Sequence, residues 1–229
     1  MTIGEILKKL KNCASPKTLA AQEHFGIAAE NRLGITAPQM RMIAKQIGTN
    51  HPLALQLWKT KIHEARQIAA MIADPALTDE KLMEQWLRDF NSWDIVDGCS
   101  SSLFRKTPYA YQKALEWTTR EKEFEKRAGF TMMAQLAVHD KKAEDKMMEQ
   151  FFEPITRESA DPRNFVRKAN NWALRQIGKR NERLCIKAIA VAKVIQRKKG
   201  TASKWIATDA LRELEKYLKE GKIKNIGGK

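Results

Sequence analysis

Apolar residues recur every three or four positions along almost the whole chain, and the alternating pattern of a half-buried strand is nearly absent. This periodicity predicts an all-α protein. The prolines agree with it, because they fall at junctions between the periodic segments, where proline is tolerated. The expected helices span residues 2–13, 16–25, 37–47, 52–60, 62–73, 79–89, 93–105, 109–119, 122–138, 142–152, 164–178, 182–198 and 202–220.

Three of the expected helices share a sequence pattern. The segments HEARQIAAMIA, FEKRAGFTMMA and FVRKANNWALR each carry a basic residue three positions after the first, and these residues are Arg66, Arg127 and Lys168. This weak self-similarity and the short connections predict a superhelical solenoid of antiparallel HEAT-like helical repeats with a concave basic groove. We expect one such domain over residues 1–220 and a basic, disordered tail over residues 221–229.

Positive charge is in large excess, since 42 Lys and Arg oppose 27 Asp and Glu for a formal net charge of +15. This excess indicates a polyanionic partner, with nucleic acid ahead of an anionic membrane surface. No apolar run approaches the roughly 18 to 20 residues that cross a bilayer. The first residues also lack the basic start and apolar core of a signal peptide. We therefore expect a soluble, cytoplasmic protein without a membrane partner.

Basic residues in the first turns of inner helices are suited to contact phosphates, which fixes position without reading sequence. For Arg66, Arg127 and Lys168 the alternative is an ion pair within the protein. The run Arg197-Lys198-Lys199 lies at an expected helix end and predicts a further phosphate contact.

The cysteines and histidines predict no metal centre. Cys13, Cys99 and Cys185 lie far apart without a CxxC pair, and the four histidines form no HExxH or HxH pattern. We expect neither a metal nor a cofactor.

The stretch NSWDIVDGC combines an indole and a carboxylate at helical spacing. Trp93 and Asp97 are four residues apart and share one helix face, after Ser92 as the predicted N-cap. Asp94 lies about 100° round the helix, where it suits the first-turn dipole better than the groove. We assign it a structural role and expect that its replacement by Asn costs only a few tenths of a kcal/mol. From this stretch alone, the alternative is that Trp93 is a core anchor and Asp97 a solvated or ion-paired acid.

Four segments together resemble a known family. They are RLGITAPQMR (32–41), SWDIVD (92–97), the helix from Phe124 to Gln135, and FVRKANNWALRQIGKRN (165–181). In their order and separation they are similar to the HEAT-like-repeat DNA glycosylases of the AlkD type, the DNA alkylation repair enzyme family. The chain departs from the family pattern at Ser92, where a second tryptophan is often found, and at Phe25, where the best-known member has a tyrosine.

The resemblance implies roles for particular residues. Trp93 and Asp97 match the catalytic tryptophan and aspartate of the family, Arg127 its active-site arginine, and Trp172 its second tryptophan. Arg175, one turn beyond Trp172, is expected to reach a phosphate or to brace that tryptophan. The implied substrate is duplex DNA containing alkylated bases, bound by a monomer that is associated with the nucleoid through DNA. The implied reaction is excision of purines alkylated at N3 or N7, without insertion of the lesion into a deep pocket.

One carboxylate suffices for such a reaction, because a cationic purine is already a good leaving group. Positive charge develops on the deoxyribose as the bond breaks. A carboxylate about 4 Å away contributes roughly 4 kcal/mol at an effective dielectric near 20, or about three orders of magnitude in rate. Two other classes remain open: a non-catalytic HEAT-like module for branched or damaged DNA, and a helical-repeat scaffold for an acidic protein.

Overall fold

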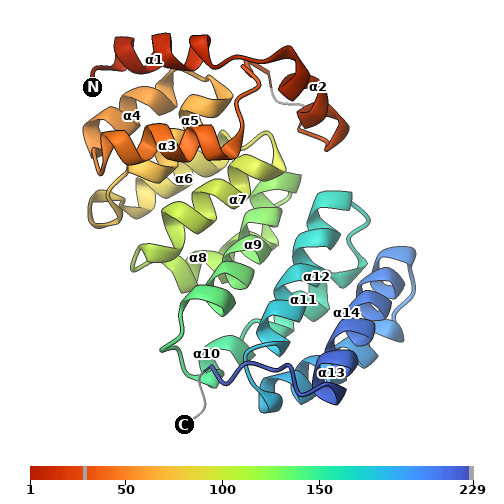
Figure 1. Cartoon of the computed structure of the whole chain (residues 1–229). Coiled ribbons are helices and arrows are strands. Elements are labelled where there is room, and N and C mark those ends of the chain that lie inside the picture. The colour runs from red at the N-terminus through yellow and green to blue at the C-terminus, as the bar shows by residue number, and fades with distance from the viewer. Residues whose placement is uncertain (28–29, 227–229) are drawn as a thin grey trace. The chain divides into compact units, whose positions relative to one another are not determined.

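The structure is a computed structural model that describes residues 1–27 and 30–226. Every regular element in these ranges is a helix, so the all-α prediction is confirmed (Figure 1). The contacts between the helices divide the chain into two compact units, Met1–Pro108 and Tyr109–Lys229. No helix in the described ranges combines the length and the apolar character that a membrane span requires. A single domain over residues 1–220 stays a prediction.

The first unit is built around helix α5. Its elements are α1 (Ile3–Asn12), α2 (Pro16–His24), α3 (Ala37–Ile47), α4 (His51–Lys59), α5 (His63–Ile72), the 3-10 helix η1 (Pro75–Leu77), α6 (Glu80–Arg88), α7 (Trp93–Ser102) and the 3-10 helix η2 (Phe104–Lys106). Helix α5 packs against α3, α4 and α7. All of its residues except Met71 are therefore buried.

The second unit is built around helix α12. Its elements are α8 (Ala110–Glu116), the 3-10 helix η3 (Trp117–Thr119), α9 (Glu123–His139), α10 (Asp145–Glu149), α11 (Phe152–Arg157), the 3-10 helix η4 (Glu158–Ala160), α12 (Asn164–Gly178), α13 (Glu182–Gln196) and α14 (Thr201–Lys219). Helix α12 packs against α9, α11, α13 and α14. It thus has the position in this unit that α5 has in the first.

One expected helix is divided in two. The periodicity predicts a helix over 142–152, but α10 ends at Glu149 and α11 begins at Phe152. Pro154 explains the break, because it has no N–H to donate to the carbonyl of Gln150 and its ring would clash with that carbonyl in a continuous helix.

The expected disordered tail is hydrogen-bonded over its described part. The backbone N–H of Lys224 donates to the carbonyl of Lys179 at 3.3 Å, and that of Ile226 to the carbonyl of Arg180 at 2.8 Å. The side chain of Asn181 in turn donates to the carbonyl of Ile226 at 3.0 Å. The chain therefore follows the end of α12 as far as Ile226, and residues 227–229 lie outside the described ranges.

The apolar faces of their helices predict that Trp58, Trp86, Trp117 and Trp205 pack in the core. This is confirmed for the first three, which are at most 3% exposed. The rings of Trp58 and Trp86 stack with their centroids 3.9 Å apart. The prediction is wrong for Trp205, which is 36% exposed. Its ring faces the guanidinium of Arg167 on α12, which lies 4.9 Å from the ring centroid.

A buried carboxylate in the first turn of α5 holds the loop that precedes α3. Glu64 is fully buried, and its Oε1 accepts the backbone N–H groups of Gly34 at 2.8 Å and Ile35 at 3.2 Å. Its Oε2 accepts the N–H of Leu33 at 2.9 Å. The loop requires glycine at position 34, because φ is +76° and a Cβ atom would lie 2.3 Å from the carbonyl oxygen of Ser15.

Replacing Glu64 by Gln is expected to lower the free energy of unfolding by about 2 kcal/mol, because charged acceptors are lost and an amide N–H group faces backbone donors. Urea denaturation followed by circular dichroism measures the change. Glu23→Gln, at an exposed position on α2, removes the same charge and should change stability by less than about 0.5 kcal/mol. Equal stability of the two variants would contradict a structural role for the Glu64 carboxylate.

Candidate functional site

Helix α7 carries the tryptophan and the aspartate that the sequence singles out. It begins at Trp93, and both Trp93 and Asp97 are half-buried on the face that residues four apart share. The indole Nε1 of Trp93 donates to the backbone carbonyl of Phe25 at 3.1 Å, which fixes the ring against the end of α2. The side chain of Phe25 is itself 69% exposed. An aromatic face and a carboxylate are therefore presented together at the start of α7.

Asp94 is the centre of a buried hydrogen-bond network. Its Oδ2 accepts from Nε2 of His63 at 2.7 Å and from Nε2 of Gln67 at 3.1 Å, and its Oδ1 accepts from Oγ of Ser92 at 2.5 Å. Ser92 is the N-cap residue of α7 as expected, but its hydroxyl donates to Asp94 instead of accepting a helix N–H. The structural role predicted for Asp94 is therefore confirmed, but this role is not limited to the helix dipole.

The protonation of Asp94 follows from these contacts. Burial alone would raise its pKa, but the hydrogen bonds and the charge of His63, with the hydrogen bonds of Ser92 and Gln67, outweigh burial and hold the pKa below the ordinary value of 3.8. The carboxylate form is thus the one that the network stabilises.

Gly98 allows α7 to approach α5 closely. A Cβ atom at Gly98 would lie 2.2 Å from Oε1 of Gln67, a distance that real Cβ atoms do not reach. Gln67 thus meets α7 at two positions. Its amide nitrogen donates a hydrogen bond to Asp94, and its amide oxygen packs against Gly98. These contacts flank Asp97 and set the position of its turn of helix.

Arg127 is anchored within the second unit. It is 6% exposed, and its Nη1 donates to the carbonyl of Phe165 in the first turn of α12 at 2.8 Å. The rings of Phe124 and Phe165 lie 5.5 Å apart beside this contact. The guanidinium is therefore held where α9 and α12 meet at their N-terminal ends.

Helix α12 presents Lys168, Trp172 and Gln176 on one face, each four residues after the last. Lys168 is exposed and Trp172 half-buried. With the side-chain amide of Gln176 oriented so that its oxygen is the acceptor, that oxygen accepts from Nε1 of Trp172 at 3.1 Å and from Nζ of Lys179 at 3.2 Å. Trp172 is thereby braced by Gln176 and not, as expected, by Arg175.

A second row of residues on α12 faces α14 at the same four-residue spacing. The α12 side is Arg167, Asn171, Arg175 and Lys179, and the α14 side is Trp205, Asp209, Glu213 and Tyr217. Arg175 pairs with Glu213 and lies 3.5 Å from the carboxylate of Asp209. Because these acids neutralise it, the geometry argues against the predicted phosphate contact of Arg175.

Arg66 is packed inside the first unit. It is 7% exposed, its guanidinium lies 5.1 Å from the ring centroid of Trp58, and its Nη2 is 3.3 Å from the carboxylate of Asp89. Arg66 thus makes the internal ion pair that was the alternative to a phosphate contact. A phosphate contact by Arg66 stays a prediction.

The helix starts explain why Arg66 differs from the two basic residues with which the sequence groups it. The fifth residues of α5, α9 and α12 are Gln67, Arg127 and Lys168. Arg66 lies one residue earlier, about 100° round its helix. Gln67 is therefore the counterpart of Arg127 and Lys168, and the sequence pattern missed it by one position.

The basic run after α13 is partly exposed. Arg197 and Lys199 are exposed, whereas Nζ of Lys198 donates to the carbonyl of Thr156 at 2.5 Å. Two of the three residues that are predicted to contact phosphates are thus accessible. The third, Lys198, holds the run against the end of α11.

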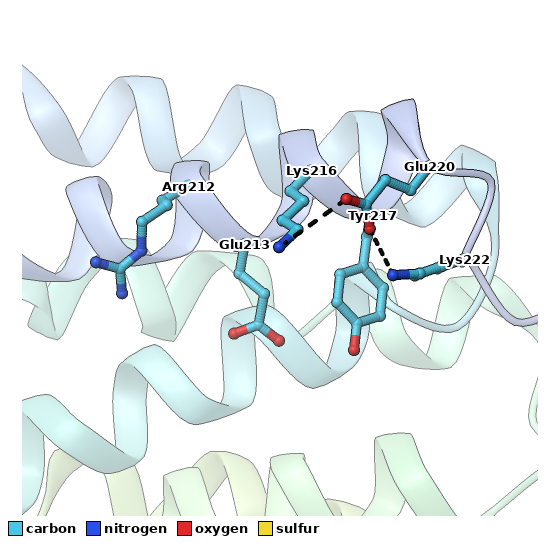
Figure 2. A pocket seen from close by; sticks show the side chains of 6 residues that line it. All are labelled: Arg212, Glu213, Lys216, Tyr217, Glu220 and Lys222. Atoms are coloured by element: carbon cyan, nitrogen blue, oxygen red, sulfur yellow. Dashed lines mark ion pairs between the residues drawn. The ribbon is translucent and has the colours of Figure 1, made fainter.

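A hollow of about 470 Å³ lies beside the end of α14 (Figure 2). Its lining residues are Arg212, Glu213, Lys216, Tyr217, Glu220 and Lys222. Lys222 and Lys216 pair with Glu220 at 2.7 and 3.9 Å. The charges of this hollow are largely balanced, so it does not form a site for a polyanion.

A protein family model matches this chain in sequence, and a solved structure matches it in fold. The family model described as DNA alkylation repair enzyme matches residues 6–214. The chain belongs to the DNA alkylation repair enzyme family. A solved structure described as "a new family of proteins related to the HEAT-like repeat DNA glycosylases with affinity for branched DNA structures" matches with a TM-score of 0.81 and 21% identity, over 97% of this chain and 96% of that one. No curated protein matches the chain in sequence.

The structural match confirms the predicted HEAT-like helical-repeat fold. Trp93, Asp97, Arg127 and Trp172 all lie within the residues that the family model matches. The structure places Trp93 and Asp97 on α7 of the first unit, and Arg127 and Trp172 on α9 and α12 of the second. Their roles in this family member stay predictions. His63 and Gln67 carry no local sequence signal, because their partner Asp94 lies about 30 residues away.

Replacing Asp94 by Asn is expected to cost about 2 kcal/mol of unfolding free energy at neutral pH, because buried donors lose a charged acceptor. Since the folded-state pKa is lowered, the stabilisation is present above the ordinary pKa of 3.8 and is lost as pH falls through the folded value. Urea unfolding of both proteins at neutral pH and near pH 3 measures this. If wild type and Asp94→Asn differed in unfolding free energy by the same amount at both pH values, the role assigned to the charge of Asp94 would be contradicted.

Proposed function

We propose that the protein is a DNA glycosylase that hydrolyses the N-glycosidic bond of cationic N3- or N7-alkylated purines in duplex DNA. The observation that carries the proposal is the position of Trp93 and Asp97 on one half-buried face of α7 in a member of the DNA alkylation repair enzyme family. The partner is duplex DNA that contains an alkylated base. The chemistry requires no metal or cofactor.

Asp97 acts on the sugar and not on the base. The alkylated purine leaves with its bonding electron pair and becomes neutral, while positive charge develops on the deoxyribose. The Asp97 carboxylate stabilises that charge and orients the water that attacks the anomeric carbon. The proton released by the water passes to the carboxylate or to solvent.

The aromatic and basic residues bind the DNA around this step. The indole of Trp93 offers an electron-rich face to the sugar, in the geometry in which an aromatic ring stabilises developing cationic character. Trp172 and Lys168 present an indole and an ammonium group from one face of α12. We assign Trp172 and Arg127 to the grip on the DNA backbone, as the family resemblance implies.

A second candidate is a non-catalytic module that binds branched or damaged DNA. It is favoured by the description of the matching solved structure, whose family has affinity for branched DNA. Trp93 and Asp97 favour the enzyme, because a module that only binds DNA has no need of an acid beside an indole. A scaffold for an acidic protein, the third alternative, predicts neither excision nor a preference for damaged DNA.

Replacing Asp97 by Asn is expected to slow excision of N7-methylguanine by about three orders of magnitude, because the lost charge contributes roughly 4 kcal/mol to a cation present only in the transition state. Single-turnover release of the base from a labelled duplex measures the rate. Binding to undamaged duplex should change little, since Asn is nearly isosteric.

The matched control for this experiment is Glu23→Gln, which removes one exposed carboxylate from the same unit. It should excise at the wild-type rate. Asp94→Asn is unsuitable as a control, because its buried network ties α7 to α5. If wild type excised no cationic purine, or if Asp97→Asn excised as fast as wild type, the branched-DNA module would be the better account.

The double variant Arg197→Gln, Lys199→Gln is expected to weaken binding to damaged and to undamaged duplex equally, because phosphate contacts carry no base information. The log–log slope of affinity against salt should become less steep by about 2. Fluorescence anisotropy over a salt series measures both effects. Lys198 is left in place because it binds the carbonyl of Thr156. A wild-type affinity that did not fall with salt would contradict DNA binding through phosphates.

A further inference from the structure

The row of contacts between α12 and α14 changes its chemistry at one end. Along the rest of the row, each polar or basic group of α12 meets an acid of α14, as Asn171 meets Asp209 at 2.7 Å. Lys179, at the far end, lies near the ring of Tyr217 but also meets Glu213 at 2.6 Å. At the first step, Arg167 meets the indole of Trp205 instead. The acid that would neutralise the cation is replaced there by an aromatic ring.

Arg167 therefore keeps its charge uncompensated. Its guanidinium lies 4.9 Å from the ring centroid of Trp205, and its Nη2 donates to Oδ1 of Asn164 at 3.3 Å. Among the described residues, no carboxylate pairs with it. Arg163, one turn earlier, differs in this respect because Asp161 neutralises it.

Trp205 is an unusual tryptophan for this chain. It is 36% exposed, and its indole N–H finds no acceptor in the described part of the protein. Lys204 beside it on α14 and Lys168 beside Arg167 on α12 are both exposed. An accessible indole thus has one cation against its ring, and an exposed lysine adjoins each member of the pair in sequence. An aromatic face beside positive charge is the arrangement of a platform for nucleic-acid bases.

We infer that Trp205 and Arg167 form a second nucleic-acid site, which takes an unpaired segment of DNA. One base of the segment stacks on Trp205, and its phosphates lie against Arg167, Lys168 and Lys204. A base inside a duplex has both faces covered by its neighbours, so only an unpaired base offers a face to the indole. The inference rests on DNA being the partner, as proposed above, and not on the excision chemistry.

The test compares a fully paired duplex with a forked duplex of the same paired length that carries unpaired arms, both undamaged. Fluorescence anisotropy with the full chain gives the two affinities at one salt concentration. Wild type should prefer the fork. Trp205→Ala should weaken binding to the fork by about tenfold and to the duplex by less than about twofold, because stacking involves only the unpaired base. Trp205→Phe keeps an aromatic face and should restore most of the preference.

A second readout reports stacking directly. With 2-aminopurine in the unpaired arm, binding of wild type and of Trp205→Phe should quench the fluorescence of that base, and binding of Trp205→Ala should not. Arg167→Gln should weaken binding to the fork, whereas Arg212→Gln, an arginine of α14 that pairs with Asp209, should keep the fork preference. Thermal melting of each variant shows whether it is folded.

Three outcomes would overturn the inference. If folded Trp205→Ala lost affinity for the fork and for the duplex by the same factor, Trp205 would be a general duplex contact. If it bound both as wild type does, the indole would serve another partner, such as a protein. If wild type bound the duplex but showed no preference for the fork, the second site would be excluded while the proposed glycosylase remained. Failure of wild type to bind any DNA would remove both.

Discussion

The first unit depends on the pairing of polar side chains that α5 buries in its first two turns. His63, Glu64, Arg66 and Gln67 are all at most 7% exposed. Burying such groups costs several kcal/mol unless each one finds a hydrogen-bond partner. Each partner comes from a different segment: Glu64 holds the loop at 33–35, Arg66 holds Asp89, and both His63 and Gln67 hold Asp94. The start of α5 therefore joins three separate segments of the unit.

These contacts of α5 also fix the position of Trp93 and Asp97 on α7. Helix α7 cannot rotate or slide against α5 without breaking the contacts of Asp94 or driving Gly98 into Gln67. Asp97 lies between these two positions, and Trp93 is fixed from the other side by the carbonyl of Phe25. The two side chains proposed to act on the sugar are thus held in position by contacts within the first unit. Preorganisation of this kind matters because a displacement of about 1 Å can cost roughly 100-fold in rate.

Helical periodicity was enough to predict the all-α class, most helix boundaries and the shared face of Trp93 and Asp97. It failed where the identity of a neighbour decides the outcome. Arg66 sits in a first turn as predicted, but a shift of one residue turns it about 100° into the core. Trp205 lies on an apolar helical face, yet its ring packs against the guanidinium of Arg167 on α12 and is not buried in the core. Asp94 looked like a dipole residue because its partners His63 and Gln67 are remote in sequence.

The net charge of +15 says little about where a polyanion would bind, because the acids determine which cations remain available. On α12, Arg175 and Lys179 face Glu213, and Arg163 is matched by Asp161, so their positive charge is largely cancelled within the protein. Arg167 lies between them in sequence and has no such partner among the described residues. The positive surface of α12 is therefore uneven although its basic residues recur regularly. Trp205 occupies a position on α14 one turn before the acid Asp209. An aromatic face and an uncancelled positive charge therefore lie together at this position.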